Sequence, residues 1–213
     1  MAGSHPDAAG PVPGAGPVNR RRLESHAELV APYLLNKVLV RGDRAGRIVE
    51  VEAYTGPDDP ASHAFRGETA RNRSMFGPAG HAYVYFTYGM HWCANVVCGP
   101  PGTAHAVLLR ALAPLDGLER MRADRPAARR DVDLCNGPAK LCQALGITGD
   151  DDAADLLAGG GGIVLVDDGV PPPDRPGNGP RVGISVATER PYRWWVEGDP
   201  CVSRARPGAL TRH

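Results

Sequence analysis

The most regular alternation of apolar and polar residues in the chain spans residues 48–57 and stops at a Gly-Pro pair. Successive side chains of a β-strand point to opposite faces, so a period of two predicts a strand here. One predicted face is apolar and suits a core: Val49, Val51 and Ala53. The other face carries two carboxylates and an aromatic ring: Glu50, Glu52 and Tyr54. Acidic residues on strands are mostly solvated, so this face is either an ordinary exposed face or the floor of a site.

Other short apolar runs, bounded by glycine, proline or asparagine, predict further strands at residues 37–41, 81–88, 91–98, 104–113, 163–166, 182–187 and 194–196. Helical spacing predicts helices at residues 23–36, 115–124 and 139–145. Residues 42–46 read as a hairpin loop, and residues 57–78, which have no period, read as a long loop of the kind that is usually functional. This order of elements predicts an α+β fold with a mainly antiparallel, curved β-sheet and peripheral helices.

Length and composition favour a single folded domain. The chain has 213 residues, 42% of them hydrophobic, which is enough for one core and short for two. Residues 1–18 are rich in Ala, Gly and Pro and have no apolar run, so we expect a disordered tail rather than a signal peptide or a membrane span. Residues 19–213 are then expected to form the domain.

Charge and cysteine content narrow the functional classes. The formal net charge is zero, so contact with nucleic acid must rest on local asymmetry, such as the arginines of residues 120–130 and the acids of residues 149–178. The five cysteines are odd in number and form no Cys-x-x-Cys motif, which predicts reduced thiols and a cytoplasmic protein rather than a disulfide framework or a zinc site. A Schiff-base mechanism would need Lys37, Lys140 or the N-terminal amine.

The remaining polar residues suit hydrolysis of a glycosidic bond. The motifs of zinc hydrolases, phosphate-binding loops, serine hydrolases and zinc deaminases are absent. Arg110 interrupts an apolar strand, so it must be paired or face a polar cavity, because an uncompensated buried charge is very costly. A carboxylate of the Glu50/Glu52 pair can activate water, and nearby tyrosines can hold a flat group by stacking. Taken singly, each of these residues has a commoner structural reading as packing or as a salt bridge.

Five segments, in this order and spacing, resemble the alkyladenine (3-methyladenine) DNA glycosylases of the mammalian type: residues 50–54, 69–76, 83–90, 108–112 and 135–142. The resemblance runs from about Ala31 to Ser203, and five motifs in register are far more specific than any one of them. It implies a monofunctional DNA glycosylase. Such an enzyme flips an alkylated or otherwise damaged purine out of duplex DNA, hydrolyses its N-glycosidic bond and leaves an abasic site.

The resemblance also implies roles for single residues. The water-activating carboxylate falls on Glu52, and Arg110 with the main-chain carbonyl of Val182 would hold that water, which leaves Glu50 without a catalytic role. The implied base pocket consists of Tyr54 on one face of the base, His63 and Tyr85 on the other, and Asn95 against the 2-amino group of a guanine. No lysine lies among these pocket residues, which argues against a Schiff base.

Further residues are implied to contact the DNA. Tyr88 would enter the duplex as a wedge, with Met90 beside it. Phosphate contacts are implied for Arg71, Arg73 and Lys140, the last at a helix start after Asn136-Gly137-Pro138 that reads equally well as an ordinary cap. The expected partner is double-stranded DNA with damaged purines, bound by a monomer without cofactor, metal or membrane. The expected location is the cytoplasm, at the nucleoid when DNA is bound.

Two other functions stay open at this point. One is a non-catalytic nucleic-acid-binding domain of the same fold, which would have no need of Glu52 and Arg110. The other is a hydrolase of free nucleosides, which would have no use for Tyr88. The chain also departs from the family's pattern: His91 replaces a tyrosine, the loop after His63 is about one residue shorter, and the acidic segment at residues 149–174 is its own.

Overall fold

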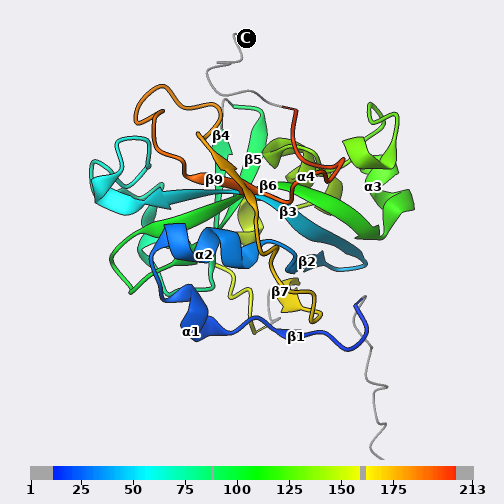
Figure 1. The fold of residues 1–213 in the computed structure, drawn as a ribbon, viewed down its shortest axis with the longest axis horizontal. Helices are drawn as coiled ribbons and strands as arrows, with labels where there is room; N and C mark the ends of the chain where they lie inside the picture. The colour runs from blue at the N-terminus through cyan, green and yellow to red at the C-terminus, as the bar shows by residue number, and fades with distance from the viewer. Residues whose placement is uncertain (1–11, 88, 159–161, 205–213) are drawn as a thin grey trace, which may run out of the picture.

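The computed structural model describes residues 12–87, 89–158 and 162–204, which form one antiparallel sheet with helices packed against it (Figure 1). The strand order is β1-β7-β2-β3-β6-β5-β4, and β9 pairs with both β3 and β8. The strands are β1 (Gly16–Pro17), β2 (Val38–Arg41), β3 (Arg44–Thr55), β4 (Ala82–Thr87), β5 (His91–Cys98), β6 (His105–Asp116), β7 (Ile163–Asp167), β8 (Gly177–Gly179) and β9 (Arg193–Trp195). The predicted α+β class, with its antiparallel sheet, is confirmed.

Four α-helices and four short 3-10 helices accompany the sheet in the described residues. The α-helices are α1 (Arg20–Leu23), α2 (Ala27–Leu34), α3 (Leu118–Asp124) and α4 (Pro138–Leu145). The 3-10 helices are η1 (Gly56–Asp58), η2 (Arg73–Phe76), η3 (Asp131–Asp133) and η4 (Gly149–Asp151). None of the described helices combines the length and the apolar character needed to cross a membrane.

The main core lies between one face of the sheet and helices α2 and α4. The helices contribute buried residues at helical spacing, among them Val30, Leu34 and Leu141. The sheet contributes alternate residues of its central strands, such as Val107 and Leu109 of β6. The intervening residues of β6 therefore point to the opposite face of the sheet, which is where the cavity described below lies.

A distortion in β3 breaks the predicted alternation. The pairing of β3 with β6 shifts register between Ile48 and Glu50 and again between Glu50 and Val51, as in a β-bulge. In consequence Val51 belongs to the main core, whereas Val49 packs in a separate cluster with Ala111. The expectation that Val49 shares a face with Val51 is therefore wrong. Both acids of this strand are nevertheless fully buried, so the reading of a solvated face is wrong as well.

Several boundaries differ from those expected from sequence. The first hairpin has a loop of two residues, 42–43, rather than five, because Arg41 already pairs with Arg44. The helix expected over residues 23–36 is divided into α1 and α2, and β6 continues to Asp116 because it pairs with Ala45 there. Residues 182–187 form no strand. The backbone N–H of Val182 instead donates to a side chain of β3, so it is not available to a sheet ladder.

The expected tail is shorter than 18 residues. Gly16 and Pro17 form β1 and pair with β7, and Val18 is buried in the core. The Ala/Gly/Pro composition that suggested disorder extends across these residues, but their backbone pairing and the burial of Val18 are decided by β7. Residues 1–11 lie outside the described part of the chain.

Gly56 ends β3 and is expected to be intolerant of substitution. Its φ is +69°, and a Cβ there would lie 2.3 Å from the carbonyl oxygen of Thr103. Gly56→Ala should therefore lower the free energy of unfolding by about 1–3 kcal/mol, measured by urea denaturation. Gly67→Ala is the matched control, because Gly67 has a φ of +90° but a Cβ there would meet no other atom within 4 Å. Equal losses in the two variants would show that the contact with Thr103 is unimportant.

Candidate active site

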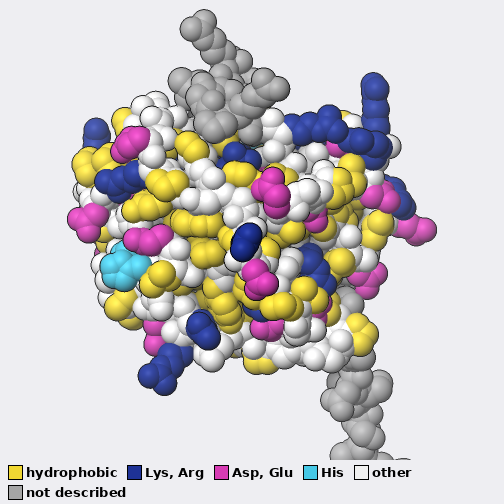
Figure 2. Space-filling view, viewed as in Figure 1, with side chains coloured by type: hydrophobic (Ala, Val, Ile, Leu, Met, Phe, Trp, Pro, Cys, Tyr) yellow, Lys and Arg dark blue, Asp and Glu magenta, His cyan; other side chains and the backbone are white. Residues whose placement is uncertain are grey.

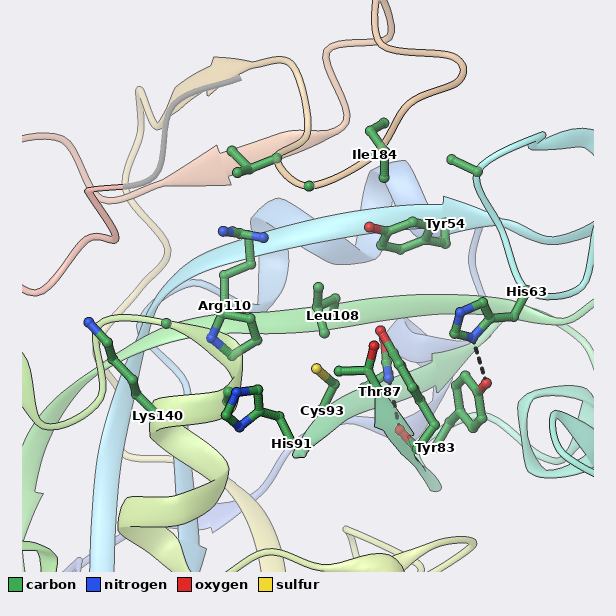
Figure 3. A pocket seen from close by; sticks show the side chains of 18 of the residues that line it. Tyr54, His63, Tyr83, Thr87, His91, Cys93, Leu108, Arg110, Lys140 and Ile184 are labelled. Atoms are coloured by element: carbon green, nitrogen blue, oxygen red, sulfur yellow. Dashed lines mark hydrogen bonds between the residues drawn. The ribbon is translucent and has the colours of Figure 1, made fainter. Parts of the chain in front are cut away.

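A cavity of about 540 Å³ lies on the face of the sheet that points away from α2. Its walls come from β3, β4, β5, β6, the loop after η1, the start of α4 and the segment 182–184. In Figure 3 the ring of Tyr54 lies above the cavity, Thr87 and Tyr83 lie below it, and His63 lies at one end. The residues implied for the base pocket all line this cavity: Tyr54, His63, Tyr85 and Asn95.

Glu52 lies directly behind the cavity wall and is held by three residues that line it. Its Oε1 accepts a hydrogen bond from the backbone N–H of Val182 at 2.7 Å and lies 3.2 Å from the Nη1 of Arg110. Its Oε2 accepts one from the hydroxyl of Tyr54 at 3.0 Å. Oε1 thus has one hydrogen-bond donor and one ion-pair partner, while Oε2 has one donor and keeps a lone pair for another. Such a carboxylate is suited to accept a proton.

Arg110 is paired, as its place in an apolar strand requires, and its partners are the two acids of β3. Its Nε donates to Oε1 of Glu50 at 3.0 Å, while Nη1 faces Glu52. Burial alone would lower the pKa of Arg110, but the charges of Glu52 and Glu50 outweigh it and raise that pKa above its usual value. The guanidinium therefore stays charged between the two carboxylates.

Glu50 is not a bystander. It is fully buried, and its Oε1 also accepts from the Nε of Arg193 at 2.7 Å and from the hydroxyl of Ser203 at 3.0 Å. Its Oε2 accepts from the backbone N–H of Ser203 at 2.7 Å. Glu50 therefore fixes the position of Arg110 from the side opposite Glu52 and connects it to the end of the described chain. No local pattern indicated this network, because Arg193 and Ser203 are far from Glu50 in sequence.

The aromatic residues of the cavity are connected to one another. His63 Nδ1 lies 2.8 Å from the hydroxyl of Tyr83, and the rings of His63 and Tyr85 meet edge to face with centroids 4.5 Å apart. Tyr83 and Tyr85 stack at 5.3 Å. Asn72 donates to the carbonyl of His63 at 2.9 Å and so fixes the loop that carries this histidine. The cavity therefore has a rigid wall of flat rings facing Tyr54.

Burial keeps these groups neutral. It raises the pKa of Tyr54 well above its usual value, with a further contribution from Glu52, so the phenol remains a donor to that carboxylate. Burial also raises the pKa of Tyr85. It lowers the pKa of His63, and the charge of Arg71 lowers it further. Asn95 is buried at the floor, where its amide donates to the carbonyl of Tyr83 at 2.9 Å.

Of the residues expected at the DNA surface, Met90 and Lys140 line the cavity. Met90 is 56% exposed and lines the cavity edge. Arg71 donates to the carbonyl of Phe86 at 2.8 Å, and exposed Arg73 pairs with Glu68 at 3.3 Å. Tyr88 lies outside the described residues.

Lys140 lies at the start of α4 and lines the cavity. Its Nζ donates to Asn136 at 2.7 Å, so Asn136 holds a side chain rather than the helix N-terminus, whose cap is Gly137. The sequence argument that no lysine lies in the pocket therefore does not hold. Burial lowers the pKa of Lys140, with a contribution from Arg125.

Charge on the face drawn in Figure 2 is mixed. Figure 2 shows acidic and basic side chains interspersed on one face of the molecule, with the basic ones densest at the edge formed by α3. Several of these arginines are paired locally: Arg122 with Asp131 at 2.8 Å and Arg130 with Asp133 at 2.9 Å. The arginine-rich segment is thus partly neutralised by its own neighbours.

Sequence reasoning missed four residues on the cavity strands, namely Tyr83, Thr87, Cys93 and Leu108. Each is two positions from an assigned residue, and the period of two places it on the same face. That signal was present and unused. Ile184 also lines the cavity, but it comes from a segment that was expected to be a strand and is not, so no local pattern identified it.

One group of described residues has potential metal ligands close together: His26, Glu28 and His105, whose ligand atoms lie within 4.8 Å of one another. None of the three lines the cavity. The Nδ1 of His105 accepts a hydrogen bond from the backbone N–H of Ala27 at 3.3 Å, which in the neutral ring places the proton on Nε2. A metal ion would have to displace that bond, so this donor set does not fit a resident metal.

The buried histidines predict a loss of stability in mild acid. Burial lowers the pKa of both His63 and His105, with smaller contributions from Arg71 and His26 respectively. The unfolded chain then binds protons more readily than the folded one. The two histidines therefore contribute fully to the free energy of unfolding above their unfolded-state pKa of about 6.5. This contribution is lost as the pH falls from there through their lower folded-state pKa values.

We expect the urea midpoint to fall between about pH 7.5 and about pH 5.5. The fall should be smaller in His105→Gln than in the wild type, and the same substitution at exposed His91 serves as the control. The prediction would be contradicted by a urea midpoint that rises as the pH is lowered. It would also be contradicted if the midpoint of His105→Gln depended on pH as steeply as that of the wild type.

Comparison with known proteins supports one family. The model of the methylpurine-DNA glycosylase family matches residues 21–200. A relative from Burkholderia lata is 58% identical over 184 residues, which cover 86% of this chain and 87% of the relative. A relative from Streptomyces avermitilis is 49% identical over 201 residues, 92% and 94% of the two chains. Another from Agrobacterium fabrum is 49% identical over 175 residues, 82% and 86%.

Each of these three bacterial proteins is named, provisionally, as a 3-methyladenine DNA glycosylase. The family match covers the strands and loops that build the cavity, from β2 to β9. This chain therefore belongs to the methylpurine-DNA glycosylase family and is a DNA glycosylase.

Proposed function

We propose that this protein removes damaged purines of the 3-methyladenine type from duplex DNA, by flipping the nucleotide and hydrolysing its N-glycosidic bond with a water molecule activated by Glu52. The observation that carries the proposal is the state of Glu52. Arg110, Val182 and Tyr54, which line the cavity, hold this carboxylate directly behind the cavity wall, and its Oε2 keeps a lone pair. A domain that only binds DNA would have no need of this arrangement.

The reaction assigns one step to each group. Oε2 of Glu52 takes a proton from water while the water oxygen forms a bond to C1′ of the deoxyribose. The bond from C1′ to the purine nitrogen breaks, and its electron pair leaves with the base. An alkylated purine is cationic and leaves as a neutral base. Arg110 pairs with the Glu52 carboxylate before the step, and the carbonyl of Val182 is the second proposed acceptor for the water.

The aromatic wall provides the energy for holding the flipped base. Extrusion from a duplex costs about a few kcal/mol. Stacking on an aromatic side chain contributes about 1–3 kcal/mol per base, so Tyr54 on one face and the rings of His63 and Tyr85 on the other can offset much of that cost. Asn95, whose amide donates to the carbonyl of Tyr83, is proposed to exclude guanine by crowding its 2-amino group.

The mouth of the cavity is proposed to meet the duplex. Met90, together with Tyr88, would fill the gap left by the flipped nucleotide, and Arg71, Arg73 and Lys140 would contact phosphates. Arg73 is held only by an exposed ion pair with Glu68, which is worth about 0–1 kcal/mol and can be exchanged for a phosphate. The resemblance to the mammalian type belongs to this proposal, and His91, which lines the cavity, stands where that type has a tyrosine.

The test is base release from defined substrates. The wild-type protein should release hypoxanthine from a duplex oligonucleotide, detected as strand cleavage after alkali, and 3-methyladenine from methylated DNA, detected by chromatography. An undamaged duplex and free deoxyinosine should remain intact. Release from the free nucleoside but not from DNA would favour a nucleoside hydrolase, and duplex binding without release would favour a non-catalytic domain.

Because Lys140 lines the cavity, the monofunctional reaction needs its own test. Sodium borohydride added during turnover should trap no covalent protein–DNA adduct. A trapped adduct that disappears in Lys140→Arg would replace the water-based mechanism with a Schiff base.

A further inference from the structure

Arg181 and Asp59 form an ion pair that is completely buried beside the candidate active site. Arg181 is 1% exposed and Asp59 is 0% exposed. The pair is bidentate: Nη2 donates to Oδ1 at 2.8 Å, and Nη1 donates to Oδ2. Nη1 also donates to the carbonyl of Ala53 at 2.9 Å. Neither charged residue lines the cavity.

This pair joins three segments that each supply a residue of the site. Ala53 is the residue of β3 between Glu52 and Tyr54. Asp59 accepts from the backbone N–H of Ala61 at 3.1 Å and belongs to the loop that leads to His63. Arg181 precedes Val182, whose N–H is bonded to Glu52. One salt bridge therefore links the strand that carries Glu52 and Tyr54, the loop that leads to His63 and the segment that carries Val182.

The guanidinium also covers one face of the Tyr54 ring. Its Cζ lies 4.6 Å from the centroid of Tyr54 and 5.4 Å from that of Tyr192, so the cation lies against two tyrosine rings. Because this face of Tyr54 is occupied by a buried side chain, a base in the cavity can stack only on the other face. Arg181 thus supports the ring from behind.

We propose that Arg181 is a positioning residue for the glycosylase reaction and that Asp59 determines how well the site accepts a cationic base. The proposal rests on the proposed function, in which Tyr54 stacks on the base and Glu52 activates the water. A positive charge behind Tyr54 opposes a positively charged base in front of it, because both compete for the electron density of one ring. Asp59 neutralises that charge in place.

Two substitutions separate these roles. Arg181→Lys keeps the charge but cannot form the bidentate pair, so Tyr54 and Val182 lose their common support. The single-turnover rate of base release should fall by about tenfold or more on every substrate. Asp59→Asn keeps the shape of the side chain and leaves the charge of Arg181 uncompensated. It should reduce release of 3-methyladenine, which is cationic while bound to the deoxyribose, by about tenfold more than release of neutral hypoxanthine.

Arg47→Lys is the matched control. Arg47 is half-buried, forms a bidentate pair with Asp168 at 3.1 and 2.6 Å, and donates to the carbonyl of Asn36 at 2.8 Å, but it does not line the cavity. The Arg47→Lys protein should release both bases at rates within about twofold of the wild type. Circular dichroism and thermal midpoints are measured for all variants. If Arg181→Lys lowers the thermal midpoint more than Arg47→Lys does, its slower release could reflect unfolding. The test is then the ratio of the release rates of the cationic and the neutral base in Asp59→Asn, because loss of folded protein lowers both rates equally.

The outcomes are distinct. This inference would be overturned if Arg181→Lys released base as fast as Arg47→Lys. It would also be overturned if Asp59→Asn lost the same factor on both bases. In either case, base release by the wild-type protein would leave the proposed function intact. A wild-type protein that releases neither base would overturn the proposed function, and this inference with it. A selective loss of 3-methyladenine release in Asp59→Asn supports the inference, because a purely structural role would not change its ratio to hypoxanthine release.

Discussion

Replacing Glu52 with glutamine is expected to reduce the single-turnover rate of base release by about two to four orders of magnitude, the usual contribution of a general base. The carboxamide keeps an oxygen for the N–H of Val182 at Oε1, but it cannot take a proton from water. The base pocket is unchanged, so affinity for a duplex that carries the lesion should be nearly that of the wild type. The rate is measured at saturating enzyme on a hypoxanthine duplex.

Tyr54→Phe is the matched variant for this prediction. It removes the hydroxyl that donates to Oε2 of Glu52 at 3.0 Å and keeps the stacking ring. It should reduce the rate much less than Glu52→Gln, since Glu52 keeps Arg110 and Val182 as partners. A rate within tenfold of the wild type in Glu52→Gln would remove Glu52 from the mechanism.

Replacing Glu50 with alanine is expected to lower the free energy of unfolding by about 3–5 kcal/mol, because it leaves the buried guanidiniums of Arg110 and Arg193 without their shared acceptor. This is a large share of the total stability of about 5–15 kcal/mol that is typical of a domain. Base release should fall as well, since Arg110 loses the group that holds it in place beside Glu52. Urea denaturation gives the stability, and rates are compared per folded molecule.

Glu68→Ala is the control for the Glu50 prediction. Glu68 also pairs with an arginine, Arg73, but that pair is exposed and should contribute about 0–1 kcal/mol. Glu50→Gln should lie between the two, because it keeps the shape of the side chain and loses its charge. A Glu50→Ala protein as stable as Glu68→Ala would show that Arg110 and Arg193 find other partners.

Local patterns predicted the antiparallel α+β class and most of the central strands, because the periods of two and 3.6 are set by backbone geometry. The pairing of Arg110 was also predictable, since a charge in an apolar strand must be compensated. The bulge at Glu50 was not predictable from the alternation. It depends on how β3 meets β6 and β9, and it is what brings Val49 to a different cluster from Val51.

The partners within the site could not be predicted from sequence. Glu52 meets the N–H of Val182 across 130 residues, and Glu50 meets Arg193 across 143. Such distances along the chain are closed by the packing of the whole sheet, and no local period reports them. The resemblance to a known family pointed to Glu52, Arg110 and Val182 as a group, but it left Glu50 without a catalytic role and assigned nothing to Arg181 and Asp59.

The sequence by itself therefore determined which residue types this protein has for its chemistry, and on which strands and loops they lie. Alternation along a strand fixes which side chains share a face, and an isolated charge demands a partner. Only the tertiary structure decided which partners those are: it set Glu52 and Glu50 on two sides of Arg110, and Arg181 behind Tyr54. The physical reason is that burial free energy is gained over the whole core, and the packing that gains it selects contacts between residues far apart in the chain.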